Sequence, residues 1–325
     1  MKIGLTLGKY APFHKGHQDL INNALHEVDK LIVVIYDSPS VINIPLPERS
    51  DWIRKLYPKK VEVIEAWGAS EEVGDTEKIK NEHEKYLGKL LNGRKIHAFY
   101  NCEFYGEHIS KYLRCINRYF EKQIDISATK IRSNPFLYRN FLEPYVYQSF
   151  IKKIVFLGGP STGKSTISEL LARKYKTNFA IEYGREYWFK KQKNHRLSMN
   201  DLETIANKHI ENEDKEVSSS NKLLFVDTSP LTTYIYAKYY FGYVSKKLEK
   251  LFIRSINRYD KYILCNNDFP FEDTWDRSGP NSRELLQRMT KEELRYRKIE
   301  YIVISGSIEQ RLRQMKKIIS ALDVK

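Results

Sequence analysis

The sequence contains little cysteine, with only Cys102, Cys115 and Cys265 among 325 residues. Their wide spacing fits neither a disulfide framework nor a zinc site, and it predicts buried or idle thiols in a reducing compartment. The sequence also lacks any hydrophobic run long enough to span a membrane, and the opening residues predict a strand rather than a targeting segment. We therefore expect a cytoplasmic protein that does not associate with membranes.

No helix-turn-helix, RNA-recognition signature, internal repeat or low-complexity tract is visible in the sequence. We therefore expect no DNA binding. A composition of 41% hydrophobic and 30% charged residues is typical of a globular chain, and a length of 325 residues suits two domains. The sequence leaves open whether the chain forms a homo-oligomer.

Positive charge is unevenly distributed along the chain. Residues 1–150 contain 22 basic and 19 acidic residues, whereas residues 151–325 contain 33 and 22, which places most of the net charge of +14 in the second half. A basic protein favours anionic partners. Because the charges are spread out, phosphorylated small molecules account for them better than nucleic acid does.

Strand-like and helix-like segments alternate in both halves, which predicts two α/β domains with mainly parallel sheets. We place the boundary so that the domains cover residues 1–148 and 149–325. The predicted strands cover residues 2–7, 31–36, 61–66, 96–100 and 153–157, and three more end at Asp227, Cys265 and Ser305. The predicted helices cover residues 16–28, 48–57, 75–91 and 164–175.

The first predicted strand runs into the sequence GKYAPFHKGH, residues 8–17. His14 and His17 lie where a helix is expected to begin, beside free backbone N–H groups and the positive end of the helix dipole. Such a place binds phosphate oxygens, and imidazole donors can stabilise charge that develops in a transition state. Gly16 lets the backbone approach the ligand closely. For an isolated pair of histidines, a solvated loop would be the better interpretation.

A second candidate phosphate-binding element is ISATKIR, residues 126–132. Ser127 is expected to cap a short helix that carries Thr129, Lys130 and Arg132. A hydroxyl cap, open N–H groups and two cations favour an anionic ligand. The alternative is an ordinary capped helix on the surface.

Together these elements resemble the HxGH and ISxTxxR signatures of the nucleotidyltransferase superfamily of adenylyltransferases. The resemblance implies a Rossmann-like sheet with ATP across its strand ends, and direct attack on the α-phosphate with release of pyrophosphate. Catalysis would then consist of positioning and charge stabilisation. The implied catalytic residues are His14, His17 and Arg132. The implied ATP contacts are Gly8, Lys9, Lys15, Gly16, Ser127 and Thr129.

The second half opens with GGPSTGKST, residues 158–166, which fits the P-loop pattern GxxxxGK[ST] between a strand and a helix. Lys164 is expected to reach the β- and γ-phosphates and Ser165 to ligate Mg²⁺. Asp227, at the end of a buried strand, is expected to hold the hydrated ion, with a strand-end turn as the alternative. Lys164 and Asp227 are therefore predicted to be catalytic. The predicted ATP-binding residues of this loop are Gly158, Gly159, Ser161, Thr162, Gly163, Lys164, Ser165 and Thr166.

Two further polar segments are candidates for the acceptor side of a kinase. In EYGRE, residues 182–186, Glu182 could accept the proton of the acceptor hydroxyl and Arg185 could bind substrate, or the segment could begin a solvated helix. The general base stays open between Glu182 and Asp227. The segment at residues 273–283 predicts a lid over ATP, with Arg277 and Arg283 near the transferred phosphoryl group. A surface loop is the alternative.

In this order, the motifs are similar to those of the NadR-like bifunctional nicotinamide-mononucleotide (NMN) adenylyltransferases and ribosylnicotinamide kinases, along nearly the whole chain. The resemblance implies an adenylyltransferase domain, a P-loop kinase domain, ATP with Mg²⁺, and the ligands ribosylnicotinamide, NMN and NAD. Trp52, Trp67 and Tyr105 are candidates for stacking on nicotinamide, with core packing as their alternative role.

Two other functions remain open at this point. A fused phosphopantetheine adenylyltransferase and dephospho-coenzyme A kinase would pair the same two domain types. A nucleotide-sensing regulator would bind ATP or NAD with one or both sites inactive. Whether the pyridine substrate is the amide or the acid also stays open, as does passage of the intermediate between the domains.

Overall fold

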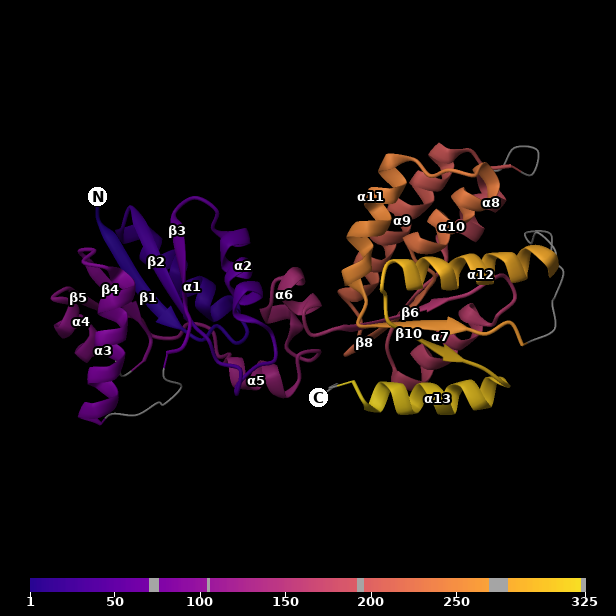
Figure 1. The fold of residues 1–325 in the computed structure, drawn as a ribbon. Helices are drawn as coiled ribbons and strands as arrows, with labels where there is room; N and C mark the ends of the chain where they lie inside the picture. Colours follow the sequence, from indigo (N-terminus) through magenta and orange to yellow (C-terminus); the bar gives the residue numbers. More distant parts are fainter. Residues whose placement is uncertain (70–75, 104–105, 192–195, 269–279, 323–325) are drawn as a thin grey trace. The chain divides into compact units, whose positions relative to one another are not determined.

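The computed structural model describes residues 1–69, 76–103, 106–191, 196–268 and 280–322. Two predicted site residues, Tyr105 and Arg277, lie outside these ranges. Contacts between residues divide the chain into two compact units, Met1–Ser149 and Phe150–Lys325. Each unit is built around its own five-stranded parallel sheet (Figure 1).

The sheet of the first unit has the strand order β3-β2-β1-β4-β5, and every pair in it is parallel. The chain leaves β1 for β2 on one side and later returns to place β4 on the other side. The carboxyl ends of β1 and β4 therefore flank a topological switch point, where open α/β sheets bind ligands. The elements are β1 (Ile3–Gly8), α1 (Lys15–Glu27), β2 (Lys30–Tyr36), α2 (Leu46–Leu56), β3 (Val61–Ala66), α3 (Glu77–Leu91), β4 (Ala98–Asn101), α4 (Gly106–Leu113), β5 (Ile116–Tyr119), α5 (Ala128–Ser133), a 3₁₀ turn (Arg139–Phe141) and α6 (Pro144–Gln148).

Continuous apolar runs place the central strands of this unit in its core. The β2 sequence KLIVVIY is buried from its second residue onward, because helices cover both faces of the sheet. On one face, Leu87 and Leu91 of α3 and Ile109 of α4 pack against Leu5 and Phe99. Figure 1 shows α1 and α2 on the opposite face.

The second unit has the strand order β10-β9-β6-β8-β7, again with parallel pairs throughout. The P-loop strand β6 is central, and β8 pairs with it so that Asp227 lies opposite Phe156. The elements are β6 (Lys152–Leu157), α7 (Lys164–Tyr175), β7 (Phe179–Ala180), α8 (Tyr183–Lys191), α9 (Met199–Val217), β8 (Leu223–Asp227), α10 (Pro230–Phe241), α11 (Lys246–Ser255), a 3₁₀ turn (Ile256–Arg258), β9 (Lys261–Cys265), α12 (Pro280–Tyr296), β10 (Tyr301–Ile304) and α13 (Ile308–Ser320).

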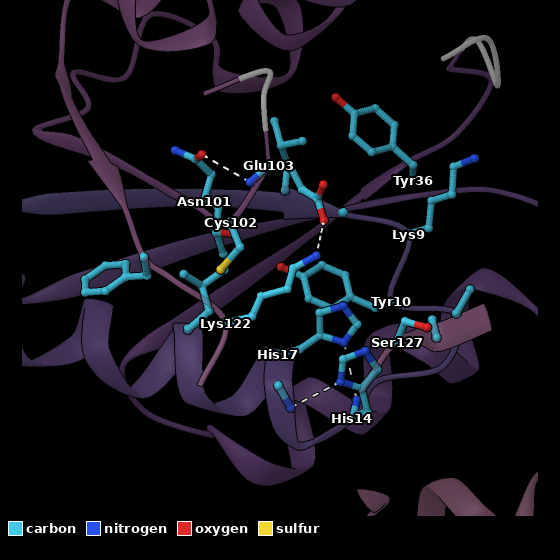
Figure 2. A pocket seen from close by; sticks show the side chains of 18 of the residues that line it. Lys9, Tyr10, His14, His17, Tyr36, Asn101, Cys102, Glu103, Lys122 and Ser127 are labelled. Atoms are coloured by element: carbon cyan, nitrogen blue, oxygen red, sulfur yellow. Dashed lines mark hydrogen bonds and ion pairs between the residues drawn. The ribbon is translucent and has the colours of Figure 1, made fainter. Parts of the chain in front are cut away.

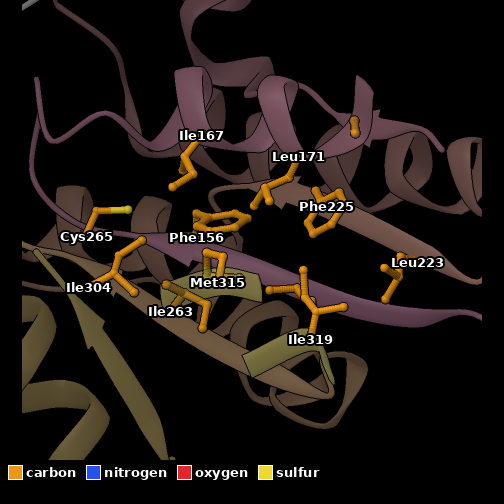
Figure 3. Close-up of a cluster of buried hydrophobic side chains, with 12 residues drawn as sticks. Phe156, Ile167, Leu171, Leu223, Phe225, Ile263, Cys265, Ile304, Met315 and Ile319 are labelled. Carbon is orange, nitrogen blue, oxygen red and sulfur yellow. The ribbon is translucent and has the colours of Figure 1, made fainter. Parts of the chain in front are cut away.

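The main core of the second unit lies between its sheet and the helices α7 and α13. Ile167 and Leu171 of α7 and Met315 of α13 pack against Phe156 and Phe225 of the central strands (Figure 3). These side chains are fully buried. The core therefore holds the strand before the P-loop and the helix after it in one rigid body.

A buried ionic cluster supports the opposite side of this sheet. The Glu213 carboxylate of α9 is fully buried and accepts hydrogen bonds from Lys153, Arg258 and Tyr259, each at 2.9 Å. Burial alone would raise the pKa of Glu213, but the Lys153 and Arg258 cations hold it below its usual value. The cluster joins α9 to β6 and to the segment before β9.

Glu213→Ala is expected to lower the free energy of unfolding of the second unit by up to about 3–5 kcal/mol, because it removes the buried acceptor shared by Lys153 and the half-buried Arg258 and leaves them only the partly exposed Asp214. The measurement is thermal inactivation of the activity of this unit. Glu211→Ala, on the exposed side of the same helix, is the matched control and is expected to cost less than about 1 kcal/mol. Equal losses for the two variants would contradict the assignment.

Within the described ranges, no helix combines the length and the apolar character needed to cross a lipid bilayer.

Candidate functional site

In the first unit, the start of α1 is built by two histidines that cap one another. The His14 Nδ1 accepts a hydrogen bond from the Gly16 N–H at 3.1 Å, and the His17 Nδ1 accepts one from the His14 N–H at 3.3 Å. The two rings stack with their centroids 3.8 Å apart. A Cβ at position 16 would lie 3.1 Å from the His14 ring, so glycine allows this ring to fold back over the helix terminus.

These hydrogen bonds determine which ring nitrogen carries the proton. Each Nδ1 accepts from a backbone N–H, so the proton of the neutral imidazole is on Nε2. Burial lowers the pKa of His14 to about 4, with the Lys122 cation adding to the effect. Burial also holds the pKa of His17 well below its usual value, with smaller contributions from His14 and Lys122. Both rings are therefore neutral Nε2–H donors at physiological pH.

Both histidines line a cavity of about 510 Å³ at the carboxyl ends of β1 and β4 (Figure 2). The structure brings eight of the nine residues predicted for this nucleotide site into its wall. Lys15 is the exception, because its exposed side chain is not part of the lining. The eight are Gly8, Lys9, His14, Gly16, His17, Ser127, Thr129 and Arg132.

The second predicted element forms the short helix α5, which Ser127 caps by accepting a hydrogen bond from the Lys130 N–H at 3.2 Å. Arg132 donates to the Ala11 carbonyl and to the Thr129 hydroxyl, so it reaches across to the loop after β1. Two segments about 120 residues apart in the sequence therefore meet at one wall of the cavity.

The cavity also contains residues that the sequence analysis did not identify. Asn101 ends β4 and Cys102 follows it, and Lys122 forms an ion pair with Glu103 at 2.8 Å (Figure 2). A signal was present, since polar residues that follow a strand next to β1 are expected at the switch point. Arg49 was also missed: its buried guanidinium donates to the Lys9, Tyr36 and Ile44 carbonyls and so holds the loop after β1.

Nitrogen-15 NMR of the imidazoles is expected to show His14 and His17 as neutral Nε2–H tautomers between pH 8 and pH 5. An unfolded chain would protonate them near pH 6.5, whereas the folded state keeps them neutral, so the free energy of unfolding falls as the pH drops from about 6.5 towards about 4. His14→Gln and His17→Gln assign the resonances. Protonation of either ring near pH 6.5, or an Nδ1–H tautomer, would contradict this geometry.

In the second unit, the loop between β6 and α7 has the backbone of a P-loop. Gly158, Ser161 and Gly163 have positive φ values of 142°, 57° and 79°, which turn the chain around the space in front of α7. The Lys164 ammonium donates to the Gly158 and Gly159 carbonyls at 3.0 and 2.9 Å. The Lys164 ammonium therefore lies over the loop, close enough to contact a phosphate bound there.

Residues outside the motif hold this loop in shape. The fully buried Arg311 of α13 donates to the Thr162 carbonyl at 2.6 Å and to the Asn266 carbonyl at 2.9 Å, which joins the loop to the end of β9. Gln287 of α12 accepts from the Gly159 N–H at 2.8 Å. The sequence gives no local signal for either residue, because their contacts with the loop cross more than 120 positions of the chain.

Two carboxylates lie beside the P-loop. Asp227, at the end of β8, is 1% exposed, interacts with the Ser165 hydroxyl, and has one oxygen, Oδ1, with no hydrogen-bond partner among the described residues. Burial raises the pKa of Glu182, and the nearby Asp227 raises it further, while Lys164 and Arg185 act in the opposite direction. The structure thus brings together the predicted residues Lys164, Ser165, Asp227, Glu182 and Arg185.

The remaining predicted residues are placed differently. Arg283 is buried in the first turns of α12 and donates to the Ser161 carbonyl of the P-loop at 3.3 Å, so residues 280–283 are helical and Arg283 lies beside the P-loop. Arg277 and the rest of the predicted lid are outside the described residues.

Trp52 is buried in α2 at 3% exposure and does not line the cavity, which fits its alternative role in the core. Trp67 is 54% exposed after β3, and its Nε1 donates to Glu65.

Comparison with known proteins assigns a family to each unit. Residues 5–134 match the cytidylyltransferase-like family and residues 153–311 match an AAA domain family. Across both units, the chain is 29% identical to the trifunctional NAD biosynthesis/regulator protein NadR of Escherichia coli (strain K12), over 92% of this chain and 78% of that protein. The same protein of Salmonella typhimurium is 28% identical over the same shares. The chain is therefore similar to NadR along both units.

Solved structures agree with a NadR-like fold over both units. A crystal structure of NadR protein in complex with NR superposes with a TM-score of 0.63 at 23% identity, covering 100% of this chain and 97% of that one. A phosphopantetheine adenylyltransferase of Fusobacterium nucleatum is 31% identical, over 50% of this chain and 88% of that protein. This second similarity is limited to one half of the chain, whereas similarity to NadR includes both halves.

The second unit of this NadR-like chain has suitable ligands for a magnesium ion. Among the described residues, no group of three or more His, Cys, Asp or Glu side chains is arranged to hold a metal. Mg²⁺ does not require such a group, because it keeps several waters and is bound by one or two protein oxygens together with substrate phosphates. The Ser165 hydroxyl and the Asp227 Oδ1, which has no hydrogen-bond partner in the described part of the chain, are oxygens of the required kind.

Proposed function

We propose that the chain makes NAD from ribosylnicotinamide in two ATP-dependent steps. The kinase unit converts ribosylnicotinamide to NMN, and the adenylyltransferase unit joins NMN to AMP. The observation that carries the proposal is that one chain contains both candidate phosphate-binding loops, each at the carboxyl ends of its own parallel sheet, in a sequence similar to NadR over 92% of its length.

In the adenylyltransferase step, a phosphate oxygen of NMN attacks the α-phosphorus of ATP. The new P–O bond forms while the bond from that phosphorus to the bridging oxygen of pyrophosphate breaks. The nucleophile is already ionised, so the site needs no general base. Neutral Nε2–H donors from His14 and His17, with the cations of Lys9 and Arg132, stabilise the negative charge that develops on the triphosphate.

In the kinase step, the 5′-hydroxyl of ribosylnicotinamide attacks the γ-phosphorus of ATP, and the bond to the bridging oxygen of ADP breaks. Glu182 accepts the hydroxyl proton, and the rise of its pKa by burial and by the nearby Asp227 makes it a stronger base. Lys164 holds the β- and γ-phosphates. Ser165 and Asp227 would hold Mg²⁺, which would neutralise charge at these phosphates.

One residue in each unit is proposed to bind the organic part of its substrate. Arg185 lies near both carboxylates of the kinase site and is proposed to bind the ribosylnicotinamide. The exposed ring of Trp67 is proposed to stack on the nicotinamide of NMN. ATP serves both units as a substrate. We also propose a cytoplasmic location, to which the three free cysteines are suited.

Product analysis of the purified protein with ribosylnicotinamide, ATP and Mg²⁺ tests the proposal. NMN is expected first and NAD afterwards, with one ADP and one pyrophosphate for each NAD. NMN supplied directly is expected to give NAD and pyrophosphate without ADP. Formation of dephospho-coenzyme A from phosphopantetheine, or no turnover with any of these substrates, would overturn the proposal.

A further inference from the structure

The turn that follows β8 has an unfavourable backbone conformation. Thr228 has φ = +69°, in the left-handed region, which a β-branched residue rarely adopts. Such a conformation persists only where the surroundings hold it, and it occurs most often at functional sites. Thr228 directly follows Asp227, the proposed magnesium ligand, and precedes Ser229, which caps α10.

Both backbone polar groups of Thr228 are bound by other elements. Its N–H donates to the Phe156 carbonyl of the P-loop strand at 3.0 Å. Its carbonyl accepts a hydrogen bond from the His209 Nε2 of α9 at 3.2 Å. The turn that carries Asp227 is therefore held from β6 on one side and from α9 on the other.

His209 lies on the buried side of α9, which also contains Ile205, Ala206 and Glu213. Its ring is 3% exposed, as is usual for a core histidine that makes a hydrogen bond. What distinguishes it is the identity of that partner. It is the carbonyl of the one strained residue that links the end of β8 to the start of α10.

The orientation of the Asp227 carboxylate depends on this turn more than on its own contacts. The carboxylate interacts with Ser165, but its Oδ1 has no hydrogen-bond partner among the residues described. Because no hydrogen bond fixes Oδ1 among these residues, the backbone of the turn contributes to the position of the carboxylate. A change in the Thr228 peptide would rotate the chain directly after Asp227.

We propose that His209 is a positioning residue of the kinase unit: through the Thr228 carbonyl it holds the left-handed turn that directs Asp227 towards the Mg²⁺ of bound ATP. The inference rests on the proposed kinase function. It assigns His209 no contact with substrate and no proton transfer.

Two substitutions at position 209 distinguish the effect of losing the His209 hydrogen bond from the effect of losing the imidazole ring. The amide nitrogen of glutamine can occupy the place of Nε2, whereas that of asparagine falls short. We expect His209→Asn to lower kcat/KM for ribosylnicotinamide phosphorylation about tenfold and to raise the Mg²⁺ concentration for half-maximal activity severalfold. His209→Gln is expected to stay within about threefold of the wild type. Adenylylation of supplied NMN should not change in either variant.

A structural role alone would give a different result. If both variants lose activity in proportion to their loss of thermal stability, with an unchanged Mg²⁺ requirement, the proposal is wrong. It is also wrong if His209→Asn behaves as the wild type does.

Relief of the backbone strain provides an independent check. Glycine adopts a positive φ without strain, so a Thr228→Gly chain should need His209 less. Adding His209→Asn to Thr228→Gly is expected to cost about threefold rather than tenfold in kcat/KM. An equal loss in both backgrounds would overturn the proposal.

Failure of the proposed function would be recognised separately. If the wild-type chain does not phosphorylate ribosylnicotinamide, the proposed function fails, but Mg²⁺-dependent binding of a non-hydrolysable ATP analogue by the kinase unit can still be measured. Weaker Mg²⁺-dependent binding in His209→Asn than in His209→Gln would then support the positioning role, and equal binding would refute it.

Discussion

Lys164→Ala is expected to lower phosphorylation of ribosylnicotinamide by about 10²–10³-fold, because it removes the ammonium group that lies over the P-loop at 2.9–3.0 Å from the Gly158 and Gly159 carbonyls. Adenylylation of supplied NMN should keep its wild-type rate, since the residues of that site all belong to the first unit. The two rates are measured separately, as ADP from ribosylnicotinamide and pyrophosphate from NMN.

Lys174→Ala is the matched control for this prediction, because Lys174 is an exposed cation in the last turn of the same helix. It should leave both rates near those of the wild type. Loss of NMN adenylylation in Lys164→Ala would contradict the assignment of independent sites, and an active Lys164→Ala kinase would contradict the role of the loop.

His17→Ala is expected to have the opposite effect, with NMN adenylylation lowered about 10²–10³-fold and phosphorylation of ribosylnicotinamide unchanged. The substitution removes the Nε2–H donor and also the Nδ1 acceptor that caps the His14 N–H. The measurement is kcat/KM for NMN at saturating ATP, with the kinase rate of the same sample as internal reference.

Asparagine and glutamine at position 17 separate the two functions of the ring. His17→Asn can keep the acceptor for the His14 N–H but lacks the distal donor, so it should remain as stable as the wild type and lose most activity. His17→Gln can keep a donor near the Nε2 position and should retain more activity than His17→Asn. The reverse order of activities would show that the ring acts mainly through the helix cap.

Long apolar strands made most of the fold predictable from the sequence. The runs at β2, β6 and β8 are buried on both faces, so their composition alone identifies them as central strands. The edge strand β5 was missed because all four of its residues are exposed and its sequence INRY has no apolar run. Edge strands are specified by pairing with a neighbour, which the local sequence does not record.

The candidate sites were predictable to the extent that each residue belongs to a local motif. In each of the loops at residues 8–17 and 158–166, the predicted phosphate-binding groups lie close together in the sequence. Their spacing is therefore enough to identify them. Lys122, Arg311 and His209 act across long distances in the sequence, and nothing next to them indicates their partners. The helical conformation of residues 280–283 was not predicted, because a polar segment with glycine and proline can also begin a helix, as it does at Pro280.

The central claim is that each unit binds its own ATP through backbone amides and cations. Calorimetric titration of the chain with a non-hydrolysable ATP analogue and Mg²⁺ tests it most directly. We predict two binding sites per chain in the wild type and one in Lys164→Ala. A single site in the wild type, or the loss of both sites in Lys164→Ala, would contradict the claim.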